Sequence, residues 1–278
     1  MRAAAEGTTV ETISMQTARQ AREAIRSGAL TGPTAGMAAG AAQGNVAIIP
    51  AAYAADYEAY CRANPRPCPL LAIGRPGDPS LPALGEDIDI RHDLPRYRLY
   101  RYGVFAGEVT DIAALWQDDM VTFVVGCSFT FENGLLEAGL SLRHHECGCN
   151  VSMYRTDIET NSVGPFGGPM VVSMRPFSPT DAVLAGQISA RYPDMHGAPV
   201  HVGDPAAIGI ADLSRVDYGD PVPLRDGEVP VFWACGVTSQ AAVEAARLPL
   251  VIAHAPGCML ITDRPHAAYA RTLESALS

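Results

Sequence analysis

The sequence lacks long apolar runs and an excess of basic residues. No stretch reaches the roughly 18 apolar residues that a membrane-spanning helix needs. Residues Met1 to Ser14 carry one basic residue and no apolar stretch, so we expect no secretory signal peptide. The formal net charge of −10 argues against general nucleic-acid binding and against docking on anionic lipid, because both need a basic face.

The cysteines do not show the spacing of a disulfide-bonded domain. The seven cysteines are an odd number, and their spacing matches no disulfide pattern. This favours free thiols in a reducing compartment, and we expect a cytoplasmic protein. The 278 residues are 48% hydrophobic and 18% charged, which is enough for a large buried core in one big domain or two modest ones.

Predicted strands and helices alternate along the chain, which favours an α/β fold. We expect a mixed sheet flanked by helices, formed by residues 1–145 and 200–278, with a smaller α+β domain at 146–199. Residues 141–168 are rich in Gly, Asn and Ser and are predicted to be irregular. The predicted helices are 15–26, 51–63, 111–119, 132–138, 178–190 and 239–247, with a short helix beginning at 205. The predicted strands are 45–50, 70–73, 97–102, 104–109, 121–125, 170–174, 200–202, 229–234, 250–254 and 259–261.

Two strand–turn–helix units are the most informative local feature. Phe123 to Ser128 and Phe232 to Thr238 each end a predicted strand in a Gly/Cys turn before a helix. The free N–H groups of a helix N-terminus can bind a carboxylate or an oxyanion, although the glycines could merely permit tight turns. Cys127 would lie where a helix N-terminus lowers a thiol pKa, but a buried structural cysteine is the commoner case and the one we favour.

Two further motifs have weak ligand signatures. The run His144-His-Glu-Cys-Gly-Cys149 contains metal-binding residue types, but Cys-x-Cys is too short for a zinc knuckle and no second ligand pair follows. We therefore assign no metal ligands and leave a divalent-metal requirement open. The loop Thr31-Gly-Pro-Thr-Ala-Gly36 could bind an anion or serve only as a connector; it lacks the Gly-Lys-Ser/Thr ending of an ATP-binding loop.

Polar residues at strand ends provide candidates for acid/base work and substrate binding. His201 is predicted to end a strand, and Asp204 before Pro205 fits both a partner for that histidine and a helix N-cap. Arg155 and Arg175 lie in otherwise uncharged stretches, which is typical of a structural ion pair or a carboxylate clamp. The run Arg96 to Tyr102 alternates basic and aromatic residues, and the acidic chain favours an amphipathic hairpin over nucleic-acid contact.

Many motifs resemble, in order, those of the hydro-lyase family that includes D-glutamate cyclase. The resemblance covers residues 15 to 266 and implies an α/β fold of a larger and a smaller domain. It also implies a lyase that closes D-glutamate to 5-oxo-D-proline and water, without a redox cofactor. The matching motifs include Gly126-Cys-Ser-Phe-Thr-Phe-Glu132, Met153-Tyr-Arg-Thr156, Gly168-Pro-Met-Val-Val-Ser-Met-Arg-Pro176, His196-Gly-Ala-Pro-Val-His201 and Pro230-Val-Phe-Trp-Ala-Cys-Gly-Val-Thr238.

Cyclisation needs an acid, a base, an oxyanion site and a cationic clamp. From the motifs we assign Glu132 and His201 as acid/base groups, with Asp204 orienting His201. The assigned carboxylate clamps are Arg155 and Arg175, and the assigned oxyanion site comprises Cys127, Ser128 and Thr238. The alternatives are a lyase for another small amino or hydroxy diacid and a non-catalytic protein that binds an amino-acid metabolite. A homodimer is the expected assembly.

Overall fold

The computed structural model describes residues 17–272, so the N-terminal segment considered as a signal peptide lies outside the described residues. The helices are α1 (Ala18–Arg26), α2 (Ala54–Ala63), α3 (Phe129–Glu137), α4 (Arg143–Cys147), α5 (Pro179–Ala190) and α6 (Val237–Ala245). The strands are β1 (Ala41–Pro50), β2 (Leu70–Ile73), β3 (Tyr97–Arg101), β4 (Val104–Val109), β5 (Met120–Gly126), β6 (Ser152–Glu159), β7 (Pro169–Phe177), β8 (His201–Val202), β9 (Val229–Ala234), β10 (Val251–His254) and β11 (Leu260–Pro265).

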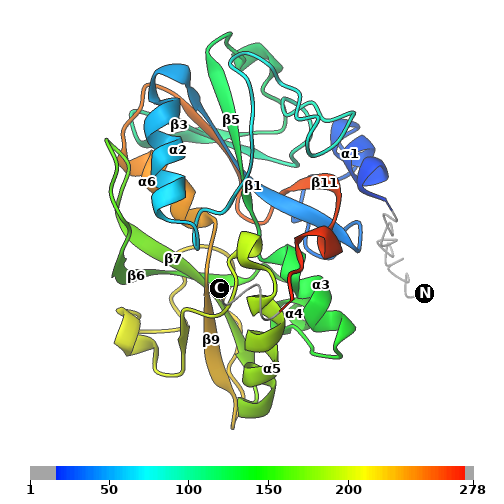
Figure 1. Ribbon diagram of the computed structural model, residues 1–278, viewed down its shortest axis with the longest axis vertical. Coiled ribbons are helices and arrows are strands. Elements are labelled where there is room, and N and C mark those ends of the chain that lie inside the picture. The colour runs from blue at the N-terminus through cyan, green and yellow to red at the C-terminus, as the bar shows by residue number, and fades with distance from the viewer. Residues whose placement is uncertain (1–16, 273–278) are drawn as a thin grey trace, which may run out of the picture.

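The strands form two sheets, which Figure 1 shows one above the other. The seven-stranded sheet has the order β2-β5-β1-β10-β3-β4, with β11 also paired to β1. The four-stranded sheet has the order β6-β7-β9-β8. It therefore takes two strands from residues 146–199 and two from the following segment, and the predicted division into domains stays a prediction. None of the helices within residues 17–272 is both long enough and apolar enough to cross a membrane.

The prediction of a mixed sheet is wrong, because every strand pair in the described part of the chain is antiparallel. A strand–helix–strand sequence gives parallel neighbours only when the chain returns to the same sheet beside its starting strand. Here α3 and α4 carry the chain from β5 to the other sheet, and α6 carries it back from β9 to β10. The helices connect the two sheets instead of building parallel pairs.

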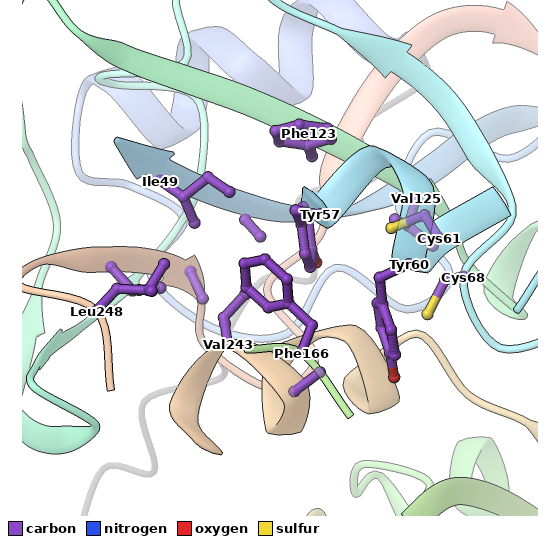
Figure 2. Close-up of a cluster of buried hydrophobic side chains, with 14 of the residues drawn as sticks. Ile49, Tyr57, Tyr60, Cys61, Cys68, Phe123, Val125, Phe166, Val243 and Leu248 are labelled. Carbon is purple, nitrogen blue, oxygen red and sulfur yellow. The ribbon is translucent and has the colours of Figure 1, made fainter. Parts of the chain in front are cut away.

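The centre of the seven-stranded sheet is buried on both faces, as the alternation of β1 shows. Ala47 and Ile49 belong to a core cluster with α2 and α6, whereas Val46 and Ile48 face a second cluster. In Figure 2, Tyr57 of α2 lies against Phe123 of β5 with ring centroids 4.8 Å apart in edge contact. Burial of such aromatic side chains is a main source of stability for this half of the molecule.

The four-stranded sheet also separates two environments. Val231 and Trp233 face α3 and α5, and the intervening Phe232 lies in a cluster with Tyr154 and Val172 on the opposite face. Successive side chains of a strand point to opposite faces, so neighbouring residues of β9 serve different cores. This alternation determines which of the predicted catalytic residues can contact one another, because side chains on opposite faces of the sheet are kept apart.

Two buried histidines are expected to make the folded state less stable at acidic pH. Burial lowers the pKa of both His196 and His254 to about 4, because the interior disfavours their charged forms. Between about pH 6.5 and 4 the unfolded chain therefore binds more protons than the folded chain, so stability falls as the pH decreases. We expect a lower free energy of unfolding at pH 5 than at pH 7 in urea titrations. A His254→Gln variant with an unchanged pH dependence would exclude this histidine as a contributor.

Candidate active site

A cleft between the two sheets brings together Arg155, the arginines of the basic–aromatic hairpin and the glycine-rich loop. It consists of two adjoining hollows of about 380 and 400 Å³, which share Arg98, Asp217 and Tyr218 as lining residues. The seven-stranded sheet contributes β3 and β4, and the four-stranded sheet contributes β6. Small-molecule sites commonly lie where two structural units meet and carry a few convergent polar groups, and this cleft has both features.

Arg155 is the central cation on the four-stranded side of the cleft. Its side chain is 44% exposed, and one terminal nitrogen donates a hydrogen bond to the Tyr218 hydroxyl. The same nitrogen lies 3.8 Å from a Glu244 carboxylate oxygen, and the guanidinium stacks 5.4 Å from the Tyr218 ring centroid. Burial raises the pKa of Tyr218 against the opposing effect of Arg155, so its hydroxyl keeps its proton at neutral pH.

The segment that carries Asp217 and Tyr218 is fixed along the edge of β6. The backbone N–H of Arg155 donates to Asp217 at 2.8 Å, and Met153 and Tyr218 form a β-bridge. Gly219 has φ +72°, and a Cβ there would lie 2.0 Å from the Val151 carbonyl oxygen. Only glycine allows this close approach, which holds the acidic segment in the cleft.

Arg96 and Arg98 form the opposite, seven-stranded side. Arg98 donates to Glu108 at 2.8 Å, and the Arg96 Nε donates to the Thr31 carbonyl at 2.9 Å. Burial raises the pKa of Glu108, but the hydrogen bonds from the two arginines outweigh it and lower the pKa overall. Pro33 of the glycine-rich loop also lines this side, so the predicted anion loop and the basic hairpin meet in one cleft.

Of the site residues assigned from sequence, Arg155 lines the cleft directly. Cys127 belongs to an apolar cluster against which Tyr218 packs, so it lies behind the cleft wall. Burial raises the pKa of the Cys127 thiol, which opposes thiolate formation. Thr238 is buried, and its hydroxyl is hydrogen-bonded to the backbone of Val171 at 2.9 and 3.2 Å.

Glu132, Arg175 and Ser128 form a separate buried cluster. The Arg175 Nε donates to Glu132 at 2.8 Å, and its terminal nitrogens donate to Ser128 at 2.9 Å and to Ser173 at 3.0 Å. Arg175 is fully buried, and its guanidinium also lies over two aromatic rings, those of Phe131 and Trp233. The structure therefore places Arg175 as an internal partner of Glu132, away from the lining of the cleft.

Electrostatics reinforce this pairing. Burial alone raises the pKa of Glu132, but the adjacent Arg175 charge and His144 outweigh it and hold the pKa well below the usual range. Burial lowers the pKa of His144 despite the nearby carboxylate. At neutral pH the cluster thus contains a paired carboxylate and a neutral imidazole.

His201 and Asp204 lie on the other face of the four-stranded sheet. The His201 ring packs on Phe232, with centroids 5.8 Å apart, whereas Arg175 lies over Trp233 on the opposite face. Asp204 caps the short helix Pro205–Ile208 by accepting the Ala206 N–H at 3.0 Å. The structure does not bring the predicted pair Glu132 and His201 together.

Sequence reasoning missed Asp217, Tyr218 and Glu244, which face Arg155 in the cleft. The first two lie in a loop without regular structure, and Glu244 lies near the C-terminal end of α6. The available signal was the compact run Asp217-Tyr-Gly-Asp220, which places acidic and aromatic side chains in a loop, and loops often carry binding and catalytic residues.

Comparison with known proteins defines the class. Residues 121–263 match the family model described as D-glutamate cyclase. A protein named "Putative hydro-lyase" from Bordetella petrii is 59% identical over 247 residues, covering 89% of this chain and 94% of the relative. A protein of the same name from Verminephrobacter eiseniae is 60% identical over 245 residues, covering 88% and 89%. The chain therefore belongs to the hydro-lyase family defined by the D-glutamate cyclase domain.

A solved structure gives only a remote comparison. A nitrogen repressor-like protein from Methanococcus jannaschii aligns with a TM-score of 0.38 and 9% identity, covering 88% of this chain and 98% of that one. A similarity this low carries no argument about fold or function.

Proposed function

We propose that the cleft converts D-glutamate into 5-oxo-D-proline and water. Family membership supports a reaction of this class, and the cleft supports a dicarboxylate substrate. The observation that carries the proposal is that Arg98 and Arg155 approach from different sheets, with Tyr218, Asp217 and Glu244 around them. Two guanidinium groups suit the two carboxylates of the substrate, and the acidic side chains suit its ammonium group.

The chemistry is balanced without a redox partner. The amine nitrogen attacks the γ-carboxyl carbon, a C–N bond forms, and one C–O bond of that carboxyl group breaks. The ammonium nitrogen loses two protons on becoming an amide, and the departing oxygen gains two on becoming water. The site must therefore move protons from nitrogen to oxygen and hold the extended substrate in a ring-closing geometry.

The lining residues can divide these tasks. Arg155 has only one terminal nitrogen engaged by described residues, so its remaining N–H groups can bind a substrate carboxylate. Tyr218, protonated and hydrogen-bonded to Arg155, is the candidate proton donor to the leaving oxygen. Asp217 and Glu244 are the candidate bases for the ammonium protons. In this assignment Arg155 keeps the clamp role predicted from sequence, and the acid/base roles pass to cleft residues.

A protein that only binds a metabolite would need the arginines but not the titratable neighbours. A tyrosine and two carboxylates line the same hollow as Arg155, which favours catalysis over binding alone. A lyase for another small amino or hydroxy diacid would use the same groups. Assays with such compounds therefore distinguish it from a D-glutamate cyclase.

The direct test is incubation of the pure protein with D-glutamate, L-glutamate, 5-oxo-D-proline and a set of other small amino and hydroxy diacids, followed by chiral chromatography. Samples treated with a chelator and samples loaded with a divalent metal are run in parallel. We expect D-glutamate to be consumed and 5-oxo-D-proline to appear, while L-glutamate is unchanged. If all samples are silent but another small diacid is dehydrated, the cyclase assignment is wrong and the lyase class stands.

A further inference from the structure

Three potential metal ligands converge next to the cluster of Glu132 and Arg175. The Nε2 of His144 lies 3.3 Å from Oε1 of Glu132, and the Nε2 of His145 lies 3.5 Å from Oε2. One ligand atom from each of the three residues fits within a span of 4.8 Å. A tetrahedral metal with bonds of about 2.0–2.1 Å places its ligand atoms roughly 3.3–3.4 Å apart. Each histidine nitrogen already lies near that separation from one of the two Glu132 oxygens, so small side-chain shifts would bring the three ligand atoms around one metal ion.

The Nε2 atoms of His144 and His145 satisfy no hydrogen bond among the described residues. Both Nε2 atoms are buried, and neither has a hydrogen-bond partner with acceptable geometry among residues 17–272. His144 is 1% exposed, so water does not readily satisfy its nitrogen. Buried polar atoms without partners are costly, and a pair aimed at one carboxylate indicates a missing cation or proton.

The two oxygens of the Glu132 carboxylate have different partners, which leaves one oxygen available to a cation. Arg175 binds Oε1 of Glu132, which leaves Oε2 facing His145. The His145 side chain is 28% exposed although its Nε2 is buried, so solvent lies one side chain away and a water molecule would complete the coordination. The ligand atoms would then be two imidazole nitrogens, one carboxylate oxygen and one water, a donor set suited to zinc and not to magnesium or calcium.

We propose that Glu132, His144 and His145 bind one zinc-class divalent cation. The positive charge of Arg175 opposes a second cation, so we expect weaker binding than at a four-ligand structural zinc site. The sequence analysis required a second Cys/His pair and therefore treated Glu132, which lies in the preceding helix α3, as an acid/base group and not as a metal ligand. The cation would fasten α4 to α3 and fix the segment that follows α4, from which Asn150 reaches the cleft.

The test is zinc titration of chelator-treated full-length protein by calorimetry, with bound metal counted by elemental analysis. We expect one zinc per chain and a higher Tm, because a ligand that binds only the folded state stabilises it. His145→Gln changes a partly exposed side chain and leaves the Glu132–Arg175 pair in place. It is expected to weaken zinc binding by about 100-fold or more, since even outer-shell changes cost about 10- to 100-fold.

The matched control is the double variant Cys147→Ser with Cys149→Ser, which removes the neighbouring thiols and keeps the proposed ligands. It should bind zinc like the wild type, and cobalt should give visible d–d bands without a thiolate charge-transfer band. Zinc binding that is absent, that survives His145→Gln, or that disappears with the two cysteines would overturn the proposal. None of these readouts depends on cyclase activity, so they are independent of the proposed function.

Discussion

Replacing Arg175 with methionine is expected to lower the free energy of unfolding by about 3–5 kcal/mol, or to prevent folding. Arg175 and Glu132 are each at most 2% exposed, and the guanidinium also satisfies Ser128 and Ser173. Methionine leaves the Glu132 carboxylate buried without its cation, and desolvation of that charge is the main cost. Urea unfolding in the presence of a chelator measures the change without a contribution from bound metal.

Two controls separate this effect from a general loss of charge. The exposed pair Arg62 and Glu58 has the same residue types at 2.6 Å, and Arg62→Met is expected to change stability by only about 0–1 kcal/mol. The double variant Arg175→Met with Glu132→Gln removes both charges and should recover part of the loss. A fully stable Arg175→Met single variant would mean that Glu132 finds another partner, such as His144.

Local sequence rules located most secondary-structure elements. Ser178 and Pro179 gave a strong N-terminal signal, and α5 begins there with Ser178 accepting the Asp181 N–H. The predicted hairpin over residues 97–109 is confirmed as β3 and β4. Strand direction was not predictable from such rules, because it depends on which sheet the chain enters after each helix.

Residues 141–168 show the opposite case. Their glycine and asparagine content indicated irregular structure, yet this segment contains α4 and β6. β6 is fixed by pairing with β7, a tertiary interaction that outweighs weak local propensity. Because β6 carries Arg155, failure to predict this strand meant that the position of Arg155 in the cleft could not be predicted either.

The two arginines singled out from sequence illustrate how burial decides role. Both have uncharged immediate neighbours in the sequence, and the pattern alone does not distinguish them. Folding places Arg175 where its donors meet internal acceptors and places Arg155 at an edge where donors remain available. Side-chain exposure and donor satisfaction, which follow from long-range packing, distinguish the buried ion pair of Arg175 from Arg155, whose free donors support the proposed clamp role.

Arg155→Met is expected to reduce kcat/KM for D-glutamate by about 100-fold or more, the usual scale for loss of one preorganised donor to a reacting or anchoring oxygen. The side chain is 44% exposed, so stability should change little while the carboxylate clamp is lost. Arg155→Lys keeps the charge but not the planar fork, and an intermediate loss is expected. Steady-state kinetics with quantified product measure both effects.

Tyr218→Phe resolves how the cleft uses this arginine. Phenylalanine keeps a ring beneath the Arg155 guanidinium and removes only the hydroxyl that Arg155 contacts. If the hydroxyl donates a proton to the leaving oxygen, kcat falls more than KM rises, whereas loss of Arg155 also weakens substrate binding. Wild-type kinetics in both Arg155→Met and Tyr218→Phe would move the active site out of this cleft without altering family membership.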